Sequence, residues 1–303
     1  MELIKITDNI HDIPNDLVAC IGEFDGIHMA HLKLIDKVKE ISRLYNKKSA
    51  VITFDPHPDY ILGKVKEEKY ITIFSDKVRI FDDLNIDYLI IINFDIKISR
   101  MDYLDFYDLY LKKFNYLVVG FDFKFGNKGL GTSKILSQIH KNVFIIDEID
   151  FNDCKIGSFI IMNHINEGKI EEANLLLGRP FSITGIVSEG SKIGKTLGFP
   201  TANINIDSMY CNLKNGVYCV NIFYNENKFL GIANYGYNPS FNLIKKPRLE
   251  VNIFDFEEDI YGKELRIEFI EFIRSEVKFE NIDDFLKQIN KDRLYCLNKY
   301  GRK

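Results

Sequence analysis

The chain has 303 residues, of which 46% are hydrophobic and 28% are charged, values typical of a globular protein. This length allows one large domain or two ordinary domains, each with its own core. The formal net charge of −4 gives no general attraction to nucleic acid or to anionic membranes, so neither is expected as a partner. No apolar run approaches the ~20 residues that span a bilayer.

The five cysteines form no CxxC pair, and their number is odd. This pattern predicts reduced thiols rather than a disulfide framework or a zinc site. The first residues, with Glu2 and Asp8 among short apolar pieces, lack the charged and then apolar layout of a secretion signal. We therefore expect a cytoplasmic protein.

Residues 1 to about 150 alternate short apolar runs with helical patterns. After the first apolar run, Leu34, Val38, Ile41 and Tyr45 recur at the spacing of one helix face. Further helices are expected near 75–84 and across 104–111. Continuous apolar strands separated by helices predict a parallel sheet covered on both faces, in which ligands bind at the carboxyl ends of the strands. The expected strands are 17–21, 50–54, 88–92, 116–119 and 143–146.

From about residue 180 the pattern changes to β-rich runs separated by turn residues. Such runs predict an antiparallel barrel or sandwich. A helix follows, with Asn281 as its N-cap and Asp283 and Asp284 in its first turn. A further helical segment, 163–177, connects the two halves. The expected strands are 181–187, 216–224, 229–234, 249–254 and 265–273.

The most informative run is Leu197-Gly198-Phe199-Pro200-Thr201-Ala202-Asn203. If Pro200 leads into a strand, Thr201 and Asn203 point to the same face. A hydroxyl and an amide carbonyl are oxygen ligands suited to Mg²⁺ with nucleotide phosphates. Glu250, on a second strand-like run, supplies a free base. A metal–phosphate site with one base is the minimum needed for phosphoryl transfer to an alcohol.

The segment before this run, Gly190-Ser191-Lys192-Ile193-Gly194-Lys195-Thr196, almost forms a P-loop. A P-loop needs four residues between its glycines and a helix after the Lys-Ser/Thr pair. Only three residues intervene here, and Pro200 opposes an immediate helix. Gly190, Gly194 and Lys195 are instead predicted to form a flap whose amide groups close over the phosphates of ATP.

The second half resembles the riboflavin kinase domain in five blocks that occur in the family's order. The resemblance implies a six-stranded barrel, covering residues 179–303, that uses Mg²⁺ and ATP to phosphorylate the terminal ribityl hydroxyl of riboflavin. By the same resemblance, Thr201 and Asn203 are metal and phosphate ligands and Glu250 is the general base, while Arg274 and Phe279 lie near the flavin. The five blocks are 197–203, 236–241, 249–251, 261–263 and 274–279.

In the first half, the run Gly22-Glu23-Phe24-Asp25-Gly26-Ile27-His28-Met29-Ala30-His31 follows the first strand and opens the first helix. His28 and His31, three residues apart, are expected on one side of this helix start. The helix amides and partial positive charge favour phosphate at the same place. Such a pair of histidines can stabilise a pentavalent phosphate and a departing pyrophosphate.

This half resembles the nucleotidyltransferase module of bacterial bifunctional FAD synthetases, with further blocks at 53–58 and 119–126. The resemblance implies a Rossmann-like domain, residues 1–178 including the connecting helices, that transfers AMP from ATP to FMN and yields FAD. His28 and His31 then contact phosphate, and Pro56 and Pro58 form part of the flavin wall. The remaining nucleotide contacts implied in this way are Gly22, Phe24, Asp25, Asp122 and Ser158.

Two segments depart from the family pattern. The family's His-x-Gly-His reads His28-Met29-Ala30-His31, which places a methyl group where close phosphate approach favours glycine. The family's Ser-Ser-Thr-x-Ile-Arg segment reads Gly157-Ser158-Phe159-Ile160-Ile161-Met162, so one serine remains. Charge-assisted phosphate contacts contribute ~1.5–3 kcal/mol each, and loss of the arginine is expected to slow adenylyl transfer.

Three interpretations follow from the sequence. The first is a bifunctional enzyme that converts riboflavin to FMN and FMN to FAD. The second is a riboflavin kinase whose first domain is a scaffold or ligand-binding module without adenylyltransferase activity. The third is a flavin-responsive regulator, which the complete set of Thr201, Asn203 and Glu250 argues against. The sequence carries no indication of oligomeric state.

Overall fold

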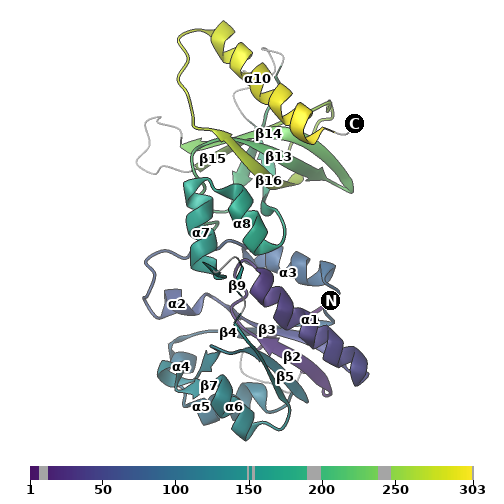
Figure 1. The fold of residues 1–303 in the computed structure, drawn as a ribbon, viewed down its shortest axis with the longest axis vertical. Coiled ribbons are helices and arrows are strands. Elements are labelled where there is room, and N and C mark those ends of the chain that lie inside the picture. Colours follow the sequence, from purple (N-terminus) through teal and green to yellow (C-terminus); the bar gives the residue numbers. More distant parts are fainter. Residues whose placement is uncertain (7–12, 149, 152–153, 190–198, 238–246, 302–303) are drawn as a thin grey trace. The chain divides into compact units, whose positions relative to one another are not determined.

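The structure is a computed structural model that describes residues 1–6, 13–148, 150–151, 154–189, 199–237 and 247–301. The chain divides into two compact units, Met1–Gly157 and Ser158–Lys303, which are described separately below (Figure 1). Among the described residues, no helix is both long and apolar enough to cross a membrane.

The first unit is built on a six-stranded parallel sheet with the order β1-β4-β3-β2-β5-β8. The predicted parallel sheet is therefore confirmed, with one more strand than expected, the edge strand β1. The strands are β1 (Glu2–Ile6), β2 (Leu17–Ile21), β3 (Lys48–Asp55), β4 (Tyr88–Asn93), β5 (Tyr116–Gly120) and β8 (Val143–Ile146).

Both faces of this sheet are covered, as the alternation of side chains along β2 shows. Leu17, Ala19 and Ile21 belong to one apolar cluster, and Val18 and Cys20 belong to the other. Successive residues of a strand point to opposite faces, so each face has its own core. The cluster that contains Val18 packs under α1 (Met29–Leu44) and α3 (Phe74–Asp83).

The opposite face is covered by shorter helical pieces. They are α4 (Ile96–Ser99), α5 (Tyr103–Phe106), a π-helical turn (Tyr107–Leu111) and α6 (Ser133–Ile139). The short helix α2 (Pro58–Ile61) has no buried residue and joins neither of the two clusters. Buried side chains of α5, the π-helical turn and α6 join the core cluster on that face. Two small hairpins complete the unit, β6 (Lys124–Phe125) with β7 (Gly131–Thr132) and β9 (Asp150–Phe151) with β10 (Cys154–Lys155).

The second unit begins with two helices, α7 (Ser158–Glu167) and α8 (Ile170–Leu177). Asn174 of α8 anchors this pair to the barrel, because its amide donates to the Phe269 carbonyl at 2.9 Å and accepts from the Phe181 amide at 2.7 Å. The domain boundary predicted after residue 178 differs from this division by these two helices.

The remainder of the second unit is a closed antiparallel barrel with the strand order β11-β12-β15-β14-β13-β16. Of the two architectures that the β-rich runs allow, the structure therefore has the barrel, as the family resemblance implies. The strands are β11 (Phe181–Ser188), β12 (Ala202–Ile206), β13 (Gly216–Tyr224), β14 (Asn227–Tyr237), β15 (Pro247–Ile253) and β16 (Glu264–Arg274).

The C-terminal helix α10 (Ile282–Tyr300) packs on this barrel (Figure 1). The predicted cap is confirmed, since the Asn281 side chain accepts a hydrogen bond from the Asp284 amide at 2.9 Å. Cys296 of the helix is fully buried in a cluster with Val217 and Ile232 of the barrel. The C-terminal turn is held by the Glu271 carboxylate, which accepts three hydrogen bonds, from Tyr295, Lys299 and Tyr300.

Candidate active sites

One row of residues crosses five strands of the barrel and defines the first site. Asn203 of β12 pairs with Glu250 of β15, which in turn pairs with Asn234 of β14. Asn234 pairs with Val217 of β13, and Val217 pairs with Arg274 of β16. Directly opposite residues in an antiparallel sheet share a face. Strand register therefore brings together residues that lie up to 71 positions apart in the sequence.

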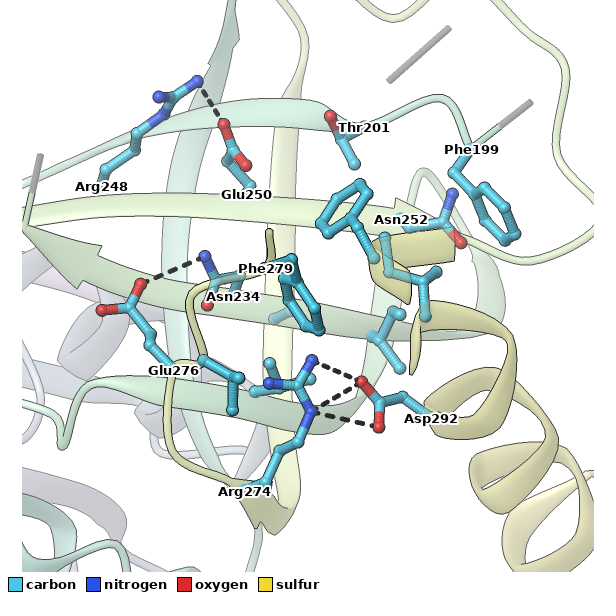
Figure 2. A pocket seen from close by; sticks show the side chains of 16 residues that line it. Phe199, Thr201, Asn234, Arg248, Glu250, Asn252, Arg274, Glu276, Phe279 and Asp292 are labelled. Atoms are coloured by element: carbon cyan, nitrogen blue, oxygen red, sulfur yellow. Dashed lines mark hydrogen bonds and ion pairs between the residues drawn. The ribbon is translucent and has the colours of Figure 1, made fainter. Parts of the chain in front are cut away.

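A cavity of about 330 Å³ opens beside this row. Its wall contains four residues that the sequence predicted for the kinase site, namely Thr201, Glu250, Arg274 and Phe279 (Figure 2). Asn203, which was also predicted for this site, is not part of the wall. Apolar side chains from the barrel and from α10 share the rest of the lining with polar ones, among them Arg248, Asn252 and Asp292. The cavity can therefore enclose a ligand that has both an apolar and a polar part.

The side chains of Asn203 and Glu250 are joined by Arg248, which the sequence analysis did not single out. Asn203 Oδ1 accepts hydrogen bonds from Arg248 Nε at 3.0 Å and from Arg248 Nη2 at 2.8 Å. The same Nη2 atom forms an ion pair with Glu250 Oε1. A period of two along β15 places Arg248 and Glu250 on one face, which is the signal that could have identified Arg248.

Arg274 lines the cavity, and its guanidinium is bound to the C-terminal helix. Arg274 Nη2 donates to Asp292 Oδ2 at 2.7 Å, and Nε donates to the same oxygen at 2.9 Å. Gln288 adds a hydrogen bond to Asp292 Oδ1 at 2.8 Å. The Asp292 side chain is only 3% exposed. This paired arrangement makes Arg274 a fixed part of the wall, and its contact with flavin stays a prediction.

A second cavity, of about 450 Å³, is lined in part by Pro200 and Thr201, the residues that precede β12. Thr201 lines both cavities. The second cavity is bordered by Pro200 and by the segment that contains Asp259 and Tyr261. Two ligands placed in the two cavities would thus approach each other near Thr201. The predicted flap residues Gly190, Gly194 and Lys195 lie outside the described residues.

In the first unit, the turn after β2 has an unusual backbone. Phe24, Gly26 and Ile27 have φ angles of 53°, 76° and 42°. A positive φ is rare for a β-branched residue such as Ile27 and is held only where the surroundings enforce it. Ile27 is fully buried, and its amide donates to the Phe24 carbonyl at 3.3 Å. The turn delivers the chain to His28, the N-cap of α1.

The predicted histidine pair is brought together at this helix start. The rings of His28 and His31 stack with centroids 3.7 Å apart and an angle of 15° between their planes. Both line a cavity of about 290 Å³ at the carboxyl end of β2, together with Gly22, Ala30 and Asp122. The cavity therefore lies where ligands bind in open parallel sheets, next to the amide groups of a 16-residue helix.

Phe24 and Asp25 support the turn instead of lining this cavity. The Phe24 ring is fully buried and packs against His31, with ring centroids 5.0 Å apart. The buried Asp25 carboxylate accepts hydrogen bonds from the amides of Ile71 and Thr72 at 3.0 and 3.1 Å. Burial raises the pKa of Asp25. Contact of Phe24 and Asp25 with nucleotide stays a prediction. Because neither side chain lines the cavity, the geometry favours contact through their main-chain groups.

A cluster of charged groups that the sequence analysis missed lies beside the turn. Lys77, only 3% exposed, donates to the Glu23 carbonyl at 2.9 Å and to Glu23 Oε1 at 3.2 Å. His57 Nε2 lies 3.8 Å from the same carboxylate oxygen. Burial raises the pKa of Glu23 to about 8, and the opposing charge of Lys77 limits the rise. Burial also lowers the pKa of His57.

His57 lies between Pro56 and Pro58, the two residues predicted for the flavin wall. Pro58 begins α2, where the His57 side chain accepts a hydrogen bond from the Asp59 amide at 3.1 Å. The His57 amide donates to the Tyr70 hydroxyl at 3.0 Å. The His57 side chain thus has a capping role, and the flavin contact of both prolines stays a prediction.

Ser158 is the first residue of α7 and follows directly after Gly157, which lines the histidine cavity. Phe159, in the place of the family's threonine, is 75% exposed. Met162, in the place of the arginine, lies one turn further along α7. The structure thus places the three residues on the first two turns of one helix, and the contact of Ser158 with ATP stays a prediction.

These features define a protein that joins a nucleotidyltransferase-like α/β unit to a kinase-like barrel. Comparison with known proteins supports both parts. A family model described as FAD synthetase matches residues 10–159, and one described as riboflavin kinase matches residues 177–299. The chain belongs to the bifunctional riboflavin kinase/FMN adenylyltransferase family.

Several curated relatives carry the name bifunctional riboflavin kinase/FMN adenylyltransferase. The Bacillus subtilis protein is 36% identical over 99% of both chains. The Listeria monocytogenes protein is 37% identical over 94% of this chain and 92% of its own. A solved structure from Streptococcus pneumoniae, titled macrolide-efflux protein, matches with a TM-score of 0.91 at 29% identity, over 98% of this chain and 99% of that chain.

Proposed function

We propose that the barrel transfers the γ-phosphoryl group of ATP to the terminal ribityl hydroxyl of riboflavin and so forms FMN. The observation that carries this proposal is the meeting of two cavities at Thr201, with Glu250 in the wall of one of them. Riboflavin is assigned to the cavity with Glu250 and Phe279, and ATP to the cavity bordered by Asp259 and Tyr261. Family membership supports the same assignment.

In this reaction Glu250 accepts the proton of the hydroxyl group while the hydroxyl oxygen attacks the γ-phosphorus. The bond to the bridging oxygen breaks, and ADP leaves with its electron pair. Thr201 and Asn203 would hold Mg²⁺, which neutralises charge on the phosphates when it is bound. The donor set fits such an ion, because Asn203 Oδ1 already accepts two hydrogen bonds from a cationic group.

We further propose that the first unit transfers AMP from ATP to FMN and forms FAD. A phosphate oxygen of FMN attacks the α-phosphorus, and pyrophosphate leaves. The amide groups at the start of α1, with His28 and His31 beside them, are placed to stabilise charge on the phosphates. The relatives cover both units under a name that includes both activities, so a kinase-only protein is not favoured.

The test is to incubate the purified chain with riboflavin, ATP and Mg²⁺ and to separate the flavins by chromatography. The proposal predicts FMN first and FAD later. FMN without FAD would overturn the assignment of the first unit, and the absence of both products would overturn both assignments. We place these reactions in the cytoplasm, in keeping with the buried thiols of Cys20, Cys219 and Cys296, which form no disulfide within the described part of the chain.

A further inference from the structure

Arg248 occupies the point at which the proposed metal ligand and the proposed base converge. Its Nη2 atom lies 2.8 Å from Asn203 Oδ1 and also forms the ion pair with Glu250 Oε1 (Figure 2 shows the latter contact). Asn203 and Glu250 are directly opposite each other on β12 and β15, and Arg248 is two residues before Glu250 on the same face. One nitrogen therefore bridges two oxygens that the proposed reaction uses separately.

This arrangement conflicts with the catalytic state in two ways. Asn203 Oδ1 accepts hydrogen bonds from Arg248 here, but in the catalytic state it has to bind a divalent cation. The guanidinium and the cation therefore compete for the same oxygen. Glu250 Oε1 has to leave the Arg248 guanidinium before this oxygen can accept a proton from the flavin hydroxyl, because the ion pair occupies it. Arg248 is 39% exposed and has room to swing toward solvent.

We propose that Arg248 is a positioning residue that holds Asn203 and Glu250 in the nucleotide-free enzyme and releases both when Mg²⁺ and nucleotide bind. This inference rests on the proposed kinase function of the barrel. It has two consequences. The guanidinium lowers the affinity for Mg²⁺–nucleotide, and the release of Glu250 couples nucleotide binding to riboflavin binding, since the freed carboxylate then accepts a hydrogen bond from the flavin hydroxyl.

The test compares Arg248→Met, which removes the charge at similar length, with Arg248→Lys, which keeps the charge. Arg266→Met is the matched control, because Arg266 pairs with Glu268 two residues along β16 and neither residue lines the flavin or nucleotide cavity. Calorimetry measures the binding of ADP in the presence of Mg²⁺. Mn²⁺ titration followed by electron paramagnetic resonance measures binding of the metal with ADP. Flavin fluorescence measures riboflavin affinity with and without Mg²⁺–ADP.

We expect Arg248→Met to bind Mg²⁺–ADP and Mn²⁺–ADP about three- to tenfold more tightly than the wild type, the size of one ion pair and one hydrogen bond. We also expect the wild type to bind riboflavin more tightly in the presence of Mg²⁺–ADP, and Arg248→Met to lose most of this enhancement. Arg248→Lys should behave more like the wild type, and Arg266→Met should be unchanged.

Unchanged or weaker Mg²⁺–ADP binding in Arg248→Met would overturn the inference, and weaker binding would identify Arg248 as a direct phosphate contact. Tighter binding in Arg266→Met as well would also overturn it, because the effect would then be one of overall charge. A wild-type chain that binds neither riboflavin nor Mg²⁺–ADP would instead overturn the proposed function.

Discussion

The two candidate sites are built in different ways. In the barrel, Asn203, Glu250 and Asn234 lie on adjacent strands, and the hydrogen-bonded register fixes which side chains meet. In the α/β unit, the site is a strained turn and the start of a helix, and much of its capacity for phosphate comes from the main chain. The barrel site therefore depends mainly on side chains that strand pairing brings together, whereas the other site combines a histidine pair with main-chain groups.

The largest expected effect follows from removal of the proposed base. Glu250→Gln keeps the shape of the side chain and should lower the turnover of riboflavin phosphorylation by about 10²–10⁴-fold, the usual cost of losing a general base. Flavin production followed by chromatography is the measurement. Glu268→Gln, at a barrel glutamate that also pairs with an arginine two residues before it, is the control and should keep its activity. Full activity in Glu250→Gln would contradict the assignment.

FAD formation at the α/β site should become faster when the positive charge of the family's arginine is restored. Met162→Arg is expected to raise the rate of FAD formation from FMN by about 10–100-fold, because one charge-assisted phosphate contact contributes ~1.5–3 kcal/mol. The comparison is Asn163→Arg, which places the same charge at the next, exposed position of α7. An equal gain in both variants would show that general charge, and not a contact at residue 162, is responsible.

The stability of α10, the helix that packs on the barrel, should depend on the ion pair between Arg274 and Asp292. Asp292→Asn is expected to reduce the free energy of opening of α10 by about 2 kcal/mol, because it leaves the Arg274 guanidinium without its buried counter-charge. Hydrogen exchange at the α10 amides is the measurement. Asp283→Asn, in the exposed first turn of the same helix, should cost only about 0.3–1 kcal/mol. Equal exchange in the two variants would rule out a special role for the pair.

The smallest expected effect is a pH dependence of the stability of the α/β unit. Glu23 has a folded pKa of about 8 against 4.5 for the unfolded chain, so between these values the folded state binds one proton more. Stability is therefore lost as the pH rises from about 5 to 8. Glu23→Gln does not titrate and should be about 1–2 kcal/mol more stable than the wild type at pH 8.5, with little difference at pH 5. About a fifth of the side chain is exposed and Lys77 is close, which keeps the effect small.

Thermal unfolding across this pH range measures the difference, with Glu67→Gln at an exposed position of the same unit as the control. If the stability difference between Glu23→Gln and the wild type does not change with pH, the proposed link between protonation of Glu23 and stability is wrong. If the wild type gains stability relative to the variant as the pH rises, the pKa of Glu23 is shifted in the opposite direction.

At both sites the sequence predicts individual residues but not the tertiary partners that those residues contact. Glu250 could be placed because the alternation of a strand converts sequence position into a face. The partners of the predicted residues could not be predicted from the sequence, because the tertiary structure determines strand register and helix docking. Arg248 meets Asn203 only through the pairing of β12 with β15, and Asp292 meets Arg274 only through the docking of α10.

The α/β site shows the same limit. The motif of the first turn predicted the histidine pair, since helix geometry brings residues three apart together. It did not predict that Phe24 and Asp25 turn into the core, nor that Glu23 meets Lys77 54 positions further along the chain. The strand β1 was missed because its five residues, Glu-Leu-Ile-Lys-Ile, are mostly exposed at the sheet edge and lack a continuous apolar run.

We propose that the chain holds two separate sites, one for each flavin reaction. A crossed assay tests this directly: Glu250→Gln and His31→Ala are each given riboflavin or FMN, with ATP and Mg²⁺. We expect Glu250→Gln to lose FMN formation but still convert FMN to FAD, and His31→Ala to form FMN but little FAD. Loss of both reactions in either variant, at unchanged folding, would contradict it.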